Sequence, residues 1–281
     1  MKPLSELTLL DRFLFACAME DQEILQSVLQ IILGQEIELR DAGETEKELR
    51  TAPWLRSIRL DVFTMDKENS VYNAEVQKKN TGNLVKRSRF YQSLIDSSLL
   101  PPGEINFNRM PPACLITITP FDLFGHKKYR YTFRMKCEEA DDLWMGDGAV
   151  RIFLNTHGKN DGEVSPELVE LLHYFEATSD ETVSGCESER IKEIHKRICR
   201  MKASEEIGVK YMQAWEEKIY ELREAKEEGF AAGRTEGIKA LIQDNLEEGV
   251  SAERIIGKLQ KRCGLDEQKA KEFFERFSSE R

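Results

Sequence analysis

Arg59-Leu60-Asp61-Val62-Phe63 and Val71-Tyr72-Asn73-Ala74-Glu75-Val76-Gln77 are two runs of alternating apolar and polar residues, with the polar segment Lys67-Glu68-Asn69-Ser70 between them. Alternation with a period of two is typical of β-strands, and the polar connection predicts a β-hairpin. Each strand carries one acid among its polar residues, Asp61 in the first and Glu75 in the second. The hairpin therefore decides where two carboxylates of this chain lie.

The two carboxylates are predicted to meet on one face of the hairpin. In the first strand Ile58, Leu60 and Val62 are expected to face one way, which leaves Asp61 on the polar face with Glu75. Residues directly opposite in an antiparallel pair have Cβ atoms about 4.5–5.5 Å apart, close enough for two carboxylates to share a hard cation such as Mg²⁺. A shift of register by one residue would separate them. The hypothesis of a metal site therefore depends on the register.

The hairpin is part of a longer series of segments. In chain order they are Leu9-Leu10-Asp11-Arg12-Phe13-Leu14-Phe15, Arg59-Leu60-Asp61-Val62, Tyr72-Asn73-Ala74-Glu75-Val76-Gln77, Lys86-Arg87-Ser88-Arg89-Phe90-Tyr91-Gln92, Phe121-Asp122-Leu123-Phe124-Gly125, Tyr131-Thr132-Phe133 and Ile152-Phe153-Leu154-Asn155-Thr156. An acid on one strand followed by acid-x-polar on the next resembles the active site of the PD-(D/E)XK phosphodiesterases. The whole series is similar to the PD-(D/E)XK nuclease family transposases, also called the Rpn family of recombination-promoting nucleases.

This resemblance implies a fold, an activity and a partner. The expected fold is α/β, a restriction-endonuclease-like core with a mixed central sheet flanked by helices, followed by a helical C-terminal extension. The expected activity is metal-dependent hydrolysis of DNA phosphodiesters in recombination, with Mg²⁺ or Mn²⁺ as cofactor. Gln77 stands where the superfamily usually has lysine, although glutamine is the usual form in the family that the chain resembles. This departure leaves the rate of turnover open.

Specific roles follow for the residues of the motif. Asp61, Glu75 and the backbone carbonyl of Val76 are the predicted metal ligands, because hard cations prefer oxygen. Gln77 is predicted to orient water or a phosphate oxygen, but an amide does not titrate and so cannot act as a general base. Asp11 is a further candidate that would hold a water molecule of the metal. An acid at the start of a helix is explained equally well by the helix dipole.

A cationic segment follows the second strand directly, with no acid before Asp96. The residues predicted to contact DNA there are Lys78, Lys79, Lys86, Arg87, Arg89 and Tyr91. Phosphate contact is favoured because these cations have no acidic neighbours in the sequence, although a solvated charged face is the alternative. The formal net charge of −10 opposes DNA binding by the chain as a whole. DNA binding would therefore depend on the positive charge of this segment, which is opposite in sign to the net charge of the chain.

Periodicity and capping residues predict the remaining elements. They are one helix or two over 7–33, an edge strand or loop over 40–50, helices from 84 to 99 and from Pro166, strands over 113–119, 129–135 and 150–154, long helices from 184 to about 229, and short helices over 251–263 and 266–277. The glycines at 229, 233 and 237 fit either a helix stripe or a flexible linker. The predicted domains are a nuclease-like domain over 1–180, a helical linker over 181–236 and a small helical unit over 237–281.

Composition excludes several classes of protein. A chain of 281 residues with 40% hydrophobic and 33% charged residues is typical of a soluble globular protein. Neither a signal peptide nor a membrane span is indicated, so a cytoplasmic location and no membrane partner are expected. Scattered cysteines and histidines, none predicted to have a partner at metal-ligand spacing, indicate free thiols and no zinc site. The cysteines are Cys17, Cys114, Cys137, Cys186, Cys199 and Cys263, and the histidines are His126, His157, His173 and His195.

Two alternatives to catalysis stay open. Gln77 and the acidic total charge are also compatible with a nuclease fold that binds DNA or protein without cutting it. The Glu-rich C-terminal helices are compatible with an interaction protein, and they predict a possible homo-oligomer through those helices.

Overall fold

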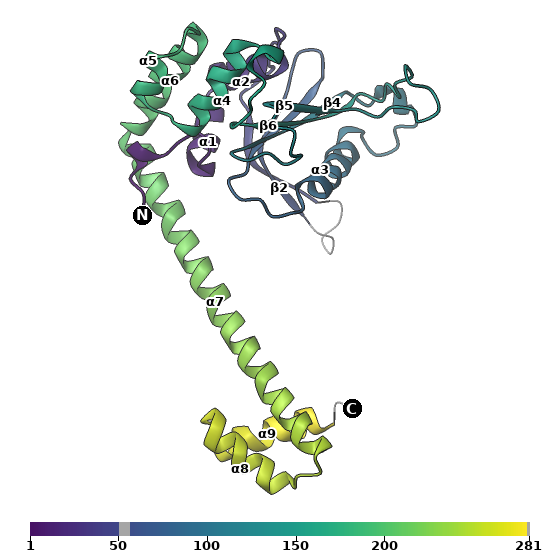
Figure 1. Cartoon of the computed structure of the whole chain (residues 1–281), viewed down its shortest axis with the longest axis vertical. Helices are drawn as coiled ribbons and strands as arrows, with labels where there is room; N and C mark the ends of the chain where they lie inside the picture. Colours follow the sequence, from purple (N-terminus) through teal and green to yellow (C-terminus); the bar gives the residue numbers. More distant parts are fainter. Residues whose placement is uncertain (51–56, 280–281) are drawn as a thin grey trace. The chain divides into compact units, whose positions relative to one another are not determined.

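The computed structural model describes residues 1–50 and 57–279, and the chain divides into two compact units, Met1–Tyr211 and Met212–Arg281. The helices of the first unit are α1 Arg12–Met19, α2 Gln22–Leu33, α3 Leu84–Leu99, α4 Pro166–Glu176, α5 Asp180–Ser184 and α6 Glu189–Lys202. Its strands are β1 Glu44–Leu49, β2 Ile58–Met65, β3 Val71–Val76, β4 Ala113–Thr119, β5 Arg130–Phe133 and β6 Ala149–Asn155. Short 3-10 turns are η1 Leu4–Glu6, η2 Phe107–Arg109 and η3 Asp161–Glu163. Figure 1 shows their arrangement.

The six strands form one mixed sheet in the order β1-β2-β3-β4-β6-β5. Strands β1, β2 and β3 pair antiparallel, β3-β4 and β4-β6 pair parallel, and β5 returns antiparallel to β6. The helix α3 connects β3 to the parallel β4, since parallel neighbours need a crossover connection. Every residue of β4 is buried, because the strand lies inside the sheet and is covered on both faces. The α/β fold with a mixed central sheet is confirmed.

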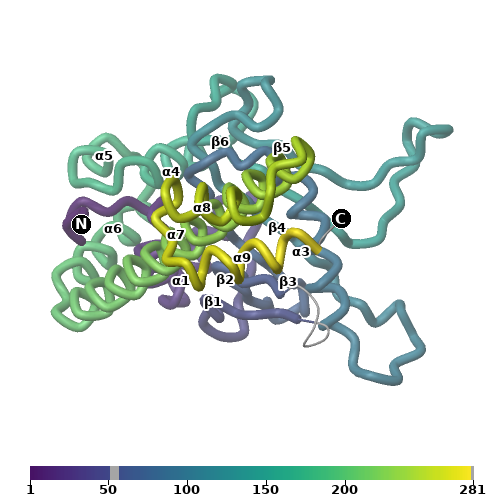
Figure 2. The backbone as a smooth tube through the Cα atoms, turned by 90° about the horizontal axis from the view of Figure 1, so that it is seen from below, coloured from purple at the N-terminus to yellow at the C-terminus, as the bar shows by residue number. Residues whose placement is uncertain are grey.

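Helices cover both faces of the sheet. The larger apolar core joins the sheet to α1, α2, α4 and α6. The smaller core joins it to α3 through Leu94 and Ile95. Figure 1 shows α3 across the sheet from α1, α2 and α4. In the perpendicular view of Figure 2, α1 lies beside β1 and β2, with which it is in contact.

The N-terminal apolar segment forms two helices with a break at Glu20-Asp21. Asp21 caps α2 by accepting hydrogen bonds from the amides of Glu23 and Ile24 at 3.0 and 3.2 Å. Gly34 ends this helix in the left-handed conformation, with φ at 69°. Of the two predicted arrangements, the structure shows the broken one.

The prediction of uniform alternation along the first hairpin strand is wrong. Ile58 and Leu60 pack in the α3 core, whereas Val62 packs in the larger core on the other face. The change of face falls at Asp61, and the facing position in β1 is Glu46, whose φ of 54° interrupts the pairing of the two strands. A local kink of this kind redirects side chains. Asp61 thus lies at an irregular point of the sheet.

The helices of the C-terminal part are α7 Glu205–Glu247, α8 Ala252–Cys263 and α9 Glu267–Ser278. The second unit has its own small core, which includes Ile238, Ile242, Ile255 and Leu259. The glycines at 229, 233 and 237 lie inside α7, so this stretch is helical, and a Cβ at any of them would meet no atom within 4 Å among the described residues. Within residues 1–50 and 57–279, no helix has the length and apolar character needed to cross a membrane.

Candidate functional site

The hairpin has the register that lets its two acids meet. The paired residues of β2 and β3 end at Val62 and Ala74, and Asp61 and Glu75 are the next residues of the two strands. Both acids are buried, with 6% of Asp61 and 5% of Glu75 exposed. Asp61 Oδ2 accepts a hydrogen bond from the Val76 amide at 3.3 Å, which ties the end of β3 to β2. The two acids therefore lie on adjacent strands next to the paired residues, and their facing arrangement stays a prediction.

The backbone carbonyl of Val76 faces the same pair of strands. The Gln77 amide donates to the Ile118 carbonyl on β4 at 2.9 Å, and the peptide bond before Gln77 is trans. The C=O and N–H of a trans peptide point in opposite directions. The Val76 carbonyl therefore points away from β4 and toward the β2 side, where Asp61 lies.

An arginine from α1 neutralises Asp61. Arg12 Nε lies 2.8 Å from Asp61 Oδ1, and its Nη2 lies 3.1 Å from Glu46 Oε2. Arg59 also pairs with Glu46, at 3.2 Å. The sequence prediction gave no role to Arg12 or Glu46. The one signal in the sequence was the position of Arg12 beside Asp11 in the N-terminal motif. Its partner Asp61 is 49 positions away and is brought close only by the fold.

A second arginine, from α3, joins Glu75 to Gln77. Arg87 Nη2 donates to Glu75 Oε2 at 3.2 Å and to Gln77 Oε1 at 3.1 Å. Gln77 also donates through Nε2 to the Lys79 carbonyl at 2.9 Å. The Tyr91 ring lies beneath the Arg87 guanidinium, with its centroid 5.5 Å away. These contacts set the orientation of both side chains of the Glu-x-Gln motif.

Burial disfavours negative charge on both hairpin acids. It raises the pKa of Glu75 to about 7, and the neighbouring Asp61 carboxylate adds to this effect. Burial also raises the pKa of Asp61, although the Arg12 guanidinium opposes the change. Asn73, two residues before Glu75, donates to Glu75 Oε1 at 3.4 Å, while its own buried Oδ1 has no partner among the described residues. The arginines thus compensate the two carboxylates only in part.

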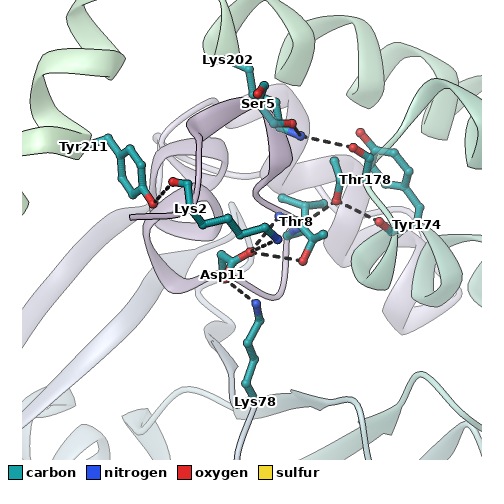
Figure 3. Close-up of polar contacts among 10 residues, drawn as sticks. Lys2, Ser5, Thr8, Asp11, Lys78, Tyr174, Thr178, Lys202 and Tyr211 are labelled. Carbon is teal, nitrogen blue, oxygen red and sulfur yellow. Dashed lines mark hydrogen bonds and ion pairs between the residues drawn. The ribbon is translucent and has the colours of Figure 1, made fainter. Parts of the chain in front are cut away.

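Asp11 belongs to a different set of contacts, shown in Figure 3. It precedes α1 and accepts a hydrogen bond from the Thr8 amide at 2.9 Å, and it pairs with Lys78 and, at 3.8 Å, with Lys2. Burial alone would raise the pKa of Asp11, but the hydrogen bonds from Lys78 and Thr8 lower it below its usual value. Asp11 therefore joins the N-terminal segment to the end of β3, beside the pair rather than within it.

The cations that follow β3 differ in their surroundings. The expectation that they have no acidic partners is wrong for Lys78, which pairs with Asp11, and for Arg87, which pairs with Glu75. Acids distant in sequence supply these partners, so the local sequence could not reveal them. Lys79, Lys86 and Arg89 are exposed, and no ion pair involves them in the described part of the chain. These three remain available to a phosphate backbone.

A comparison with protein families gives one match. The family model described as PD-(D/E)XK nuclease family transposase matches residues 12–225, well over half of the 281 residues. The chain belongs to the PD-(D/E)XK nuclease family transposases. The matched region includes Asp61, Glu75, Gln77 and α3 and excludes Asp11. No curated protein and no solved structure matches the chain.

The hairpin site of this family member fits a divalent cation. Two carboxylates and a backbone carbonyl form an oxygen-only donor set, which suits Mg²⁺ or Mn²⁺ better than softer metals. Burial and the nearby Asp61 carboxylate raise the pKa of Glu75 more than the Arg87 guanidinium lowers it. A bound cation would supply the missing positive charge.

The histidines are less isolated than the sequence predicts. His195 Nε2 lies 2.9 Å from Asp180 Oδ1 and 3.4 Å from Cys199 Sγ, and His157 Nε2 lies 2.7 Å from Glu176 Oε1. The prediction that no histidine has an acid or thiol at metal-ligand spacing is therefore wrong for His195. Helical spacing of four residues placed His195 near Cys199, but Asp180 reaches them from another helix.

Proposed function

We propose that this chain is a Mg²⁺- or Mn²⁺-dependent DNA endonuclease of the recombination-promoting type. The observation that carries the proposal is that two buried carboxylates, Asp61 and Glu75, lie on adjacent strands of the hairpin, with the Val76 carbonyl directed toward the side of β2. Membership of a nuclease family supports the same chemistry. That membership also supports a role in recombination or in the movement of genetic elements.

The Asp61 and Glu75 carboxylates and the Val76 carbonyl would hold the cation. When bound, such a cation neutralises charge on the scissile phosphate and lowers the pKa of water. Asp61 is restrained by the Val76 amide and Glu75 by Arg87, so both carboxylates already have defined orientations. Protons compete with the cation for the same oxygens, and the raised pKa of Glu75 makes this competition strong below neutral pH.

Gln77 and Arg87 act as positioning residues in this proposal. Gln77 would orient water or a phosphate oxygen through its amide, and it neither takes up nor releases a proton. Arg87 contacts both Glu75 and Gln77, so it fixes the spacing between the ligand and the orienting amide. Asp11 would contribute indirectly, because its ion pair with Lys78 fastens the N-terminal segment to the end of β3.

DNA would approach from the side of the cationic segment. Lys79, Lys86 and Arg89 are exposed and would contact phosphates directly. Lys78 and Arg87 already neutralise acids, and Tyr91 packs against Arg87. We expect Lys78, Arg87 and Tyr91 to contact DNA near the scissile phosphate only when their present contacts are released.

Cleavage of supercoiled plasmid tests the proposal. Wild-type protein with Mg²⁺ or Mn²⁺ is expected to nick the plasmid, and EDTA is expected to stop the reaction. Asp61→Asn and Glu75→Gln keep the size of the side chains and remove one negative charge each, so both should abolish nicking. Glu68→Gln, an exposed acid in the turn of the same hairpin, is the matched control and should nick normally. Equal nicking by all four proteins would show that a contaminating nuclease is responsible.

Binding without cleavage is a second candidate function. It is favoured by the two arginines that pair with both acids in this structure, and by Gln77, which supplies no titratable group. A gel-shift assay with the same proteins separates the two candidates. A DNA complex that forms normally in wild type, with no nicking under either metal, would favour the binding module.

A further inference from the structure

A second group of metal-binding atoms lies in the first unit, outside the hairpin site. Asp180 is the first residue of α5, while His195 and Cys199 are one turn apart on α6 and so share a face of that helix. One ligand atom from each of the three residues lies within 4.8 Å of the other two. The Nε2 atom of His195 is central, 2.9 Å from Asp180 Oδ1 and 3.4 Å from Cys199 Sγ.

The other ring nitrogen of His195, Nδ1, contacts a buried tyrosine. His195 Nδ1 lies 2.9 Å from the hydroxyl oxygen of Tyr174, a fully buried residue of α4. The two rings meet edge to face, with centroids 5.6 Å apart. If Nδ1 carries the proton and donates it to Tyr174, Nε2 has a free lone pair beside Asp180 Oδ1, while Cys199 Sγ lies alongside the ring, 3.4 Å from Nε2 and 3.9 Å from Nδ1. Metal-binding histidines are commonly oriented by such a second contact.

We propose that Asp180, His195 and Cys199 bind one zinc ion, with water as the fourth ligand. Ligand atoms about 2.0–2.3 Å from one zinc ion at tetrahedral angles lie about 3.3–3.6 Å from one another. The distance of 3.4 Å between Nε2 and Sγ falls in this range, but Sγ also lies 3.9 Å from Nδ1, so the exposed Cys199 side chain would have to rotate toward a metal on the Nε2 lone pair. The distance of 2.9 Å between Nε2 and Oδ1 is shorter, but the Asp180 side chain is 99% exposed and is free to move outward by the difference.

The chemistry of the donor atoms favours zinc over the metal of the hairpin site. A thiolate and an imidazole select borderline metals such as Zn²⁺, whereas Mg²⁺ prefers oxygen ligands only. A nucleophilic cysteine would need His195 between the thiol and the acid, with one on each ring nitrogen. Here the thiol lies nearer to Nε2, the nitrogen that contacts Asp180, and Tyr174 contacts Nδ1. The geometry therefore serves a metal better than a nucleophile.

A zinc ion here would fasten the helical layer of the first unit. It would join the five-residue α5 to α6, and Tyr174 extends the connection to α4. Thr178, on the segment between α4 and α5, accepts a hydrogen bond from the Leu9 amide, and Lys202 donates to the Thr178 and Ser5 carbonyls (Figure 3). The expected role is therefore structural, at the place where the N-terminal segment meets α5 and α6.

Cobalt substitution tests this proposal independently of the nuclease proposal. The full chain carrying Glu75→Gln is titrated with Co²⁺, so that the hairpin site is weakened and its all-oxygen ligands cannot imitate the signal. Tetrahedral Co²⁺ with a thiolate ligand gives a charge-transfer band in the near ultraviolet and visible d–d bands. These bands should saturate at one Co²⁺ per chain, resist excess Mg²⁺ and disappear on addition of Zn²⁺.

Single substitutions assign the ligands. Cys199→Ser should remove the charge-transfer band, whereas Cys186→Ser, a buried cysteine at the end of α5, should keep it. Asp180→Asn changes an exposed side chain, and it should weaken Co²⁺ binding by about tenfold or more. A full-strength band in Cys199→Ser, unchanged affinity in Asp180→Asn, or no band in the parent protein would each overturn the proposal.

Discussion

Asp61 and Glu75 differ from Asp11, the third acid of the same region, in what surrounds them. The hairpin pair is buried, and burial raises the pKa of both carboxyl groups despite the arginine beside each. Asp11 is partly exposed, and its contacts with Lys78 and Thr8 lower its pKa. Asp11 already has the positive charge that it needs. In our proposal, a divalent cation supplies the positive charge that would balance the buried pair.

Two adjacent residues at the start of α1 make contacts in these two different electrostatic environments. Asp11 and Arg12 are adjacent, yet Asp11 contacts Lys78 after β3 whereas Arg12 contacts Asp61 on β2. Within one turn of chain, Arg12 pairs with an acid of the hairpin, while Asp11 pairs with Lys78, a cation of the segment after β3. The N-terminal segment therefore influences the charge of the hairpin site without being a ligand in our proposal.

The largest expected difference is in catalysis. Asp61→Asn or Glu75→Gln should lower Mg²⁺-dependent nicking by about 100-fold or more, since even outer-shell partners of a metal contribute 10–100-fold. Asp11→Asn should lower it by less than about tenfold, because that residue acts only through Lys78. Initial rates on supercoiled plasmid at saturating Mg²⁺ give the comparison. Equal losses in all three variants would place Asp11 among the metal ligands and remove the distinction.

Metal-free stability should change in opposite directions in the two environments. The pKa of Glu75 in the fold, about 7, lies above its ordinary value of 4.5, so its contribution to stability is present below about pH 4.5 and is lost as pH rises through about 7. Glu75→Gln should therefore stabilise the metal-free protein at pH 8 by on the order of 1–3 kcal/mol and change little at pH 4. Thermal or urea unfolding in EDTA measures this.

Asp11→Asn supplies the matched comparison for stability. Its folded pKa is lowered, so the ionised carboxylate stabilises the fold above its ordinary pKa, and this contribution is lost as pH falls through the lowered value. The variant should be less stable than wild type at pH 8, opposite in sign to Glu75→Gln. Added Mg²⁺ should stabilise wild type and Asp11→Asn but not Glu75→Gln. A destabilised Glu75→Gln protein at pH 8 would contradict the view that the buried charge is under-compensated.

Local pattern was sufficient to predict much of the fold. The spacing of apolar residues predicted the hairpin, α3 from 84 to 99 and the buried strand from 113 to 119, and the structure has these bounds. The helix predicted from Pro166 begins at that residue, and Ser165 before it caps the helix by accepting a hydrogen bond from the Leu168 amide at 3.3 Å. These features depend on residues within a few positions of one another, so a single sequence contains the necessary information.

Contacts between distant segments could not be predicted in this way. Arg12 meets Asp61, and Asp180 meets His195, only because the folded sheet and helices bring them together. The change of face at Asp61 was also missed, because its partner Glu46 adopts a positive φ that composition does not indicate. Ion pairs across the fold and irregular backbone thus limit what one sequence reveals about a site.

DNA affinity gives the smallest expected effect and separates free cations from paired ones. Lys86→Ala and Arg89→Ala should each lower the slope of log affinity against log salt by about 0.9, the value for one lost phosphate contact on duplex DNA. Lys78→Ala should change the slope less, since this lysine already neutralises Asp11. Arg200→Ala, an exposed arginine on α6, is the surface control. Fluorescence anisotropy with a labelled duplex in EDTA, at several salt concentrations, measures each slope. A larger change for Lys78 than for Lys86 and Arg89 would mean that DNA displaces Asp11 from its lysine, and the two environments would then be coupled during binding.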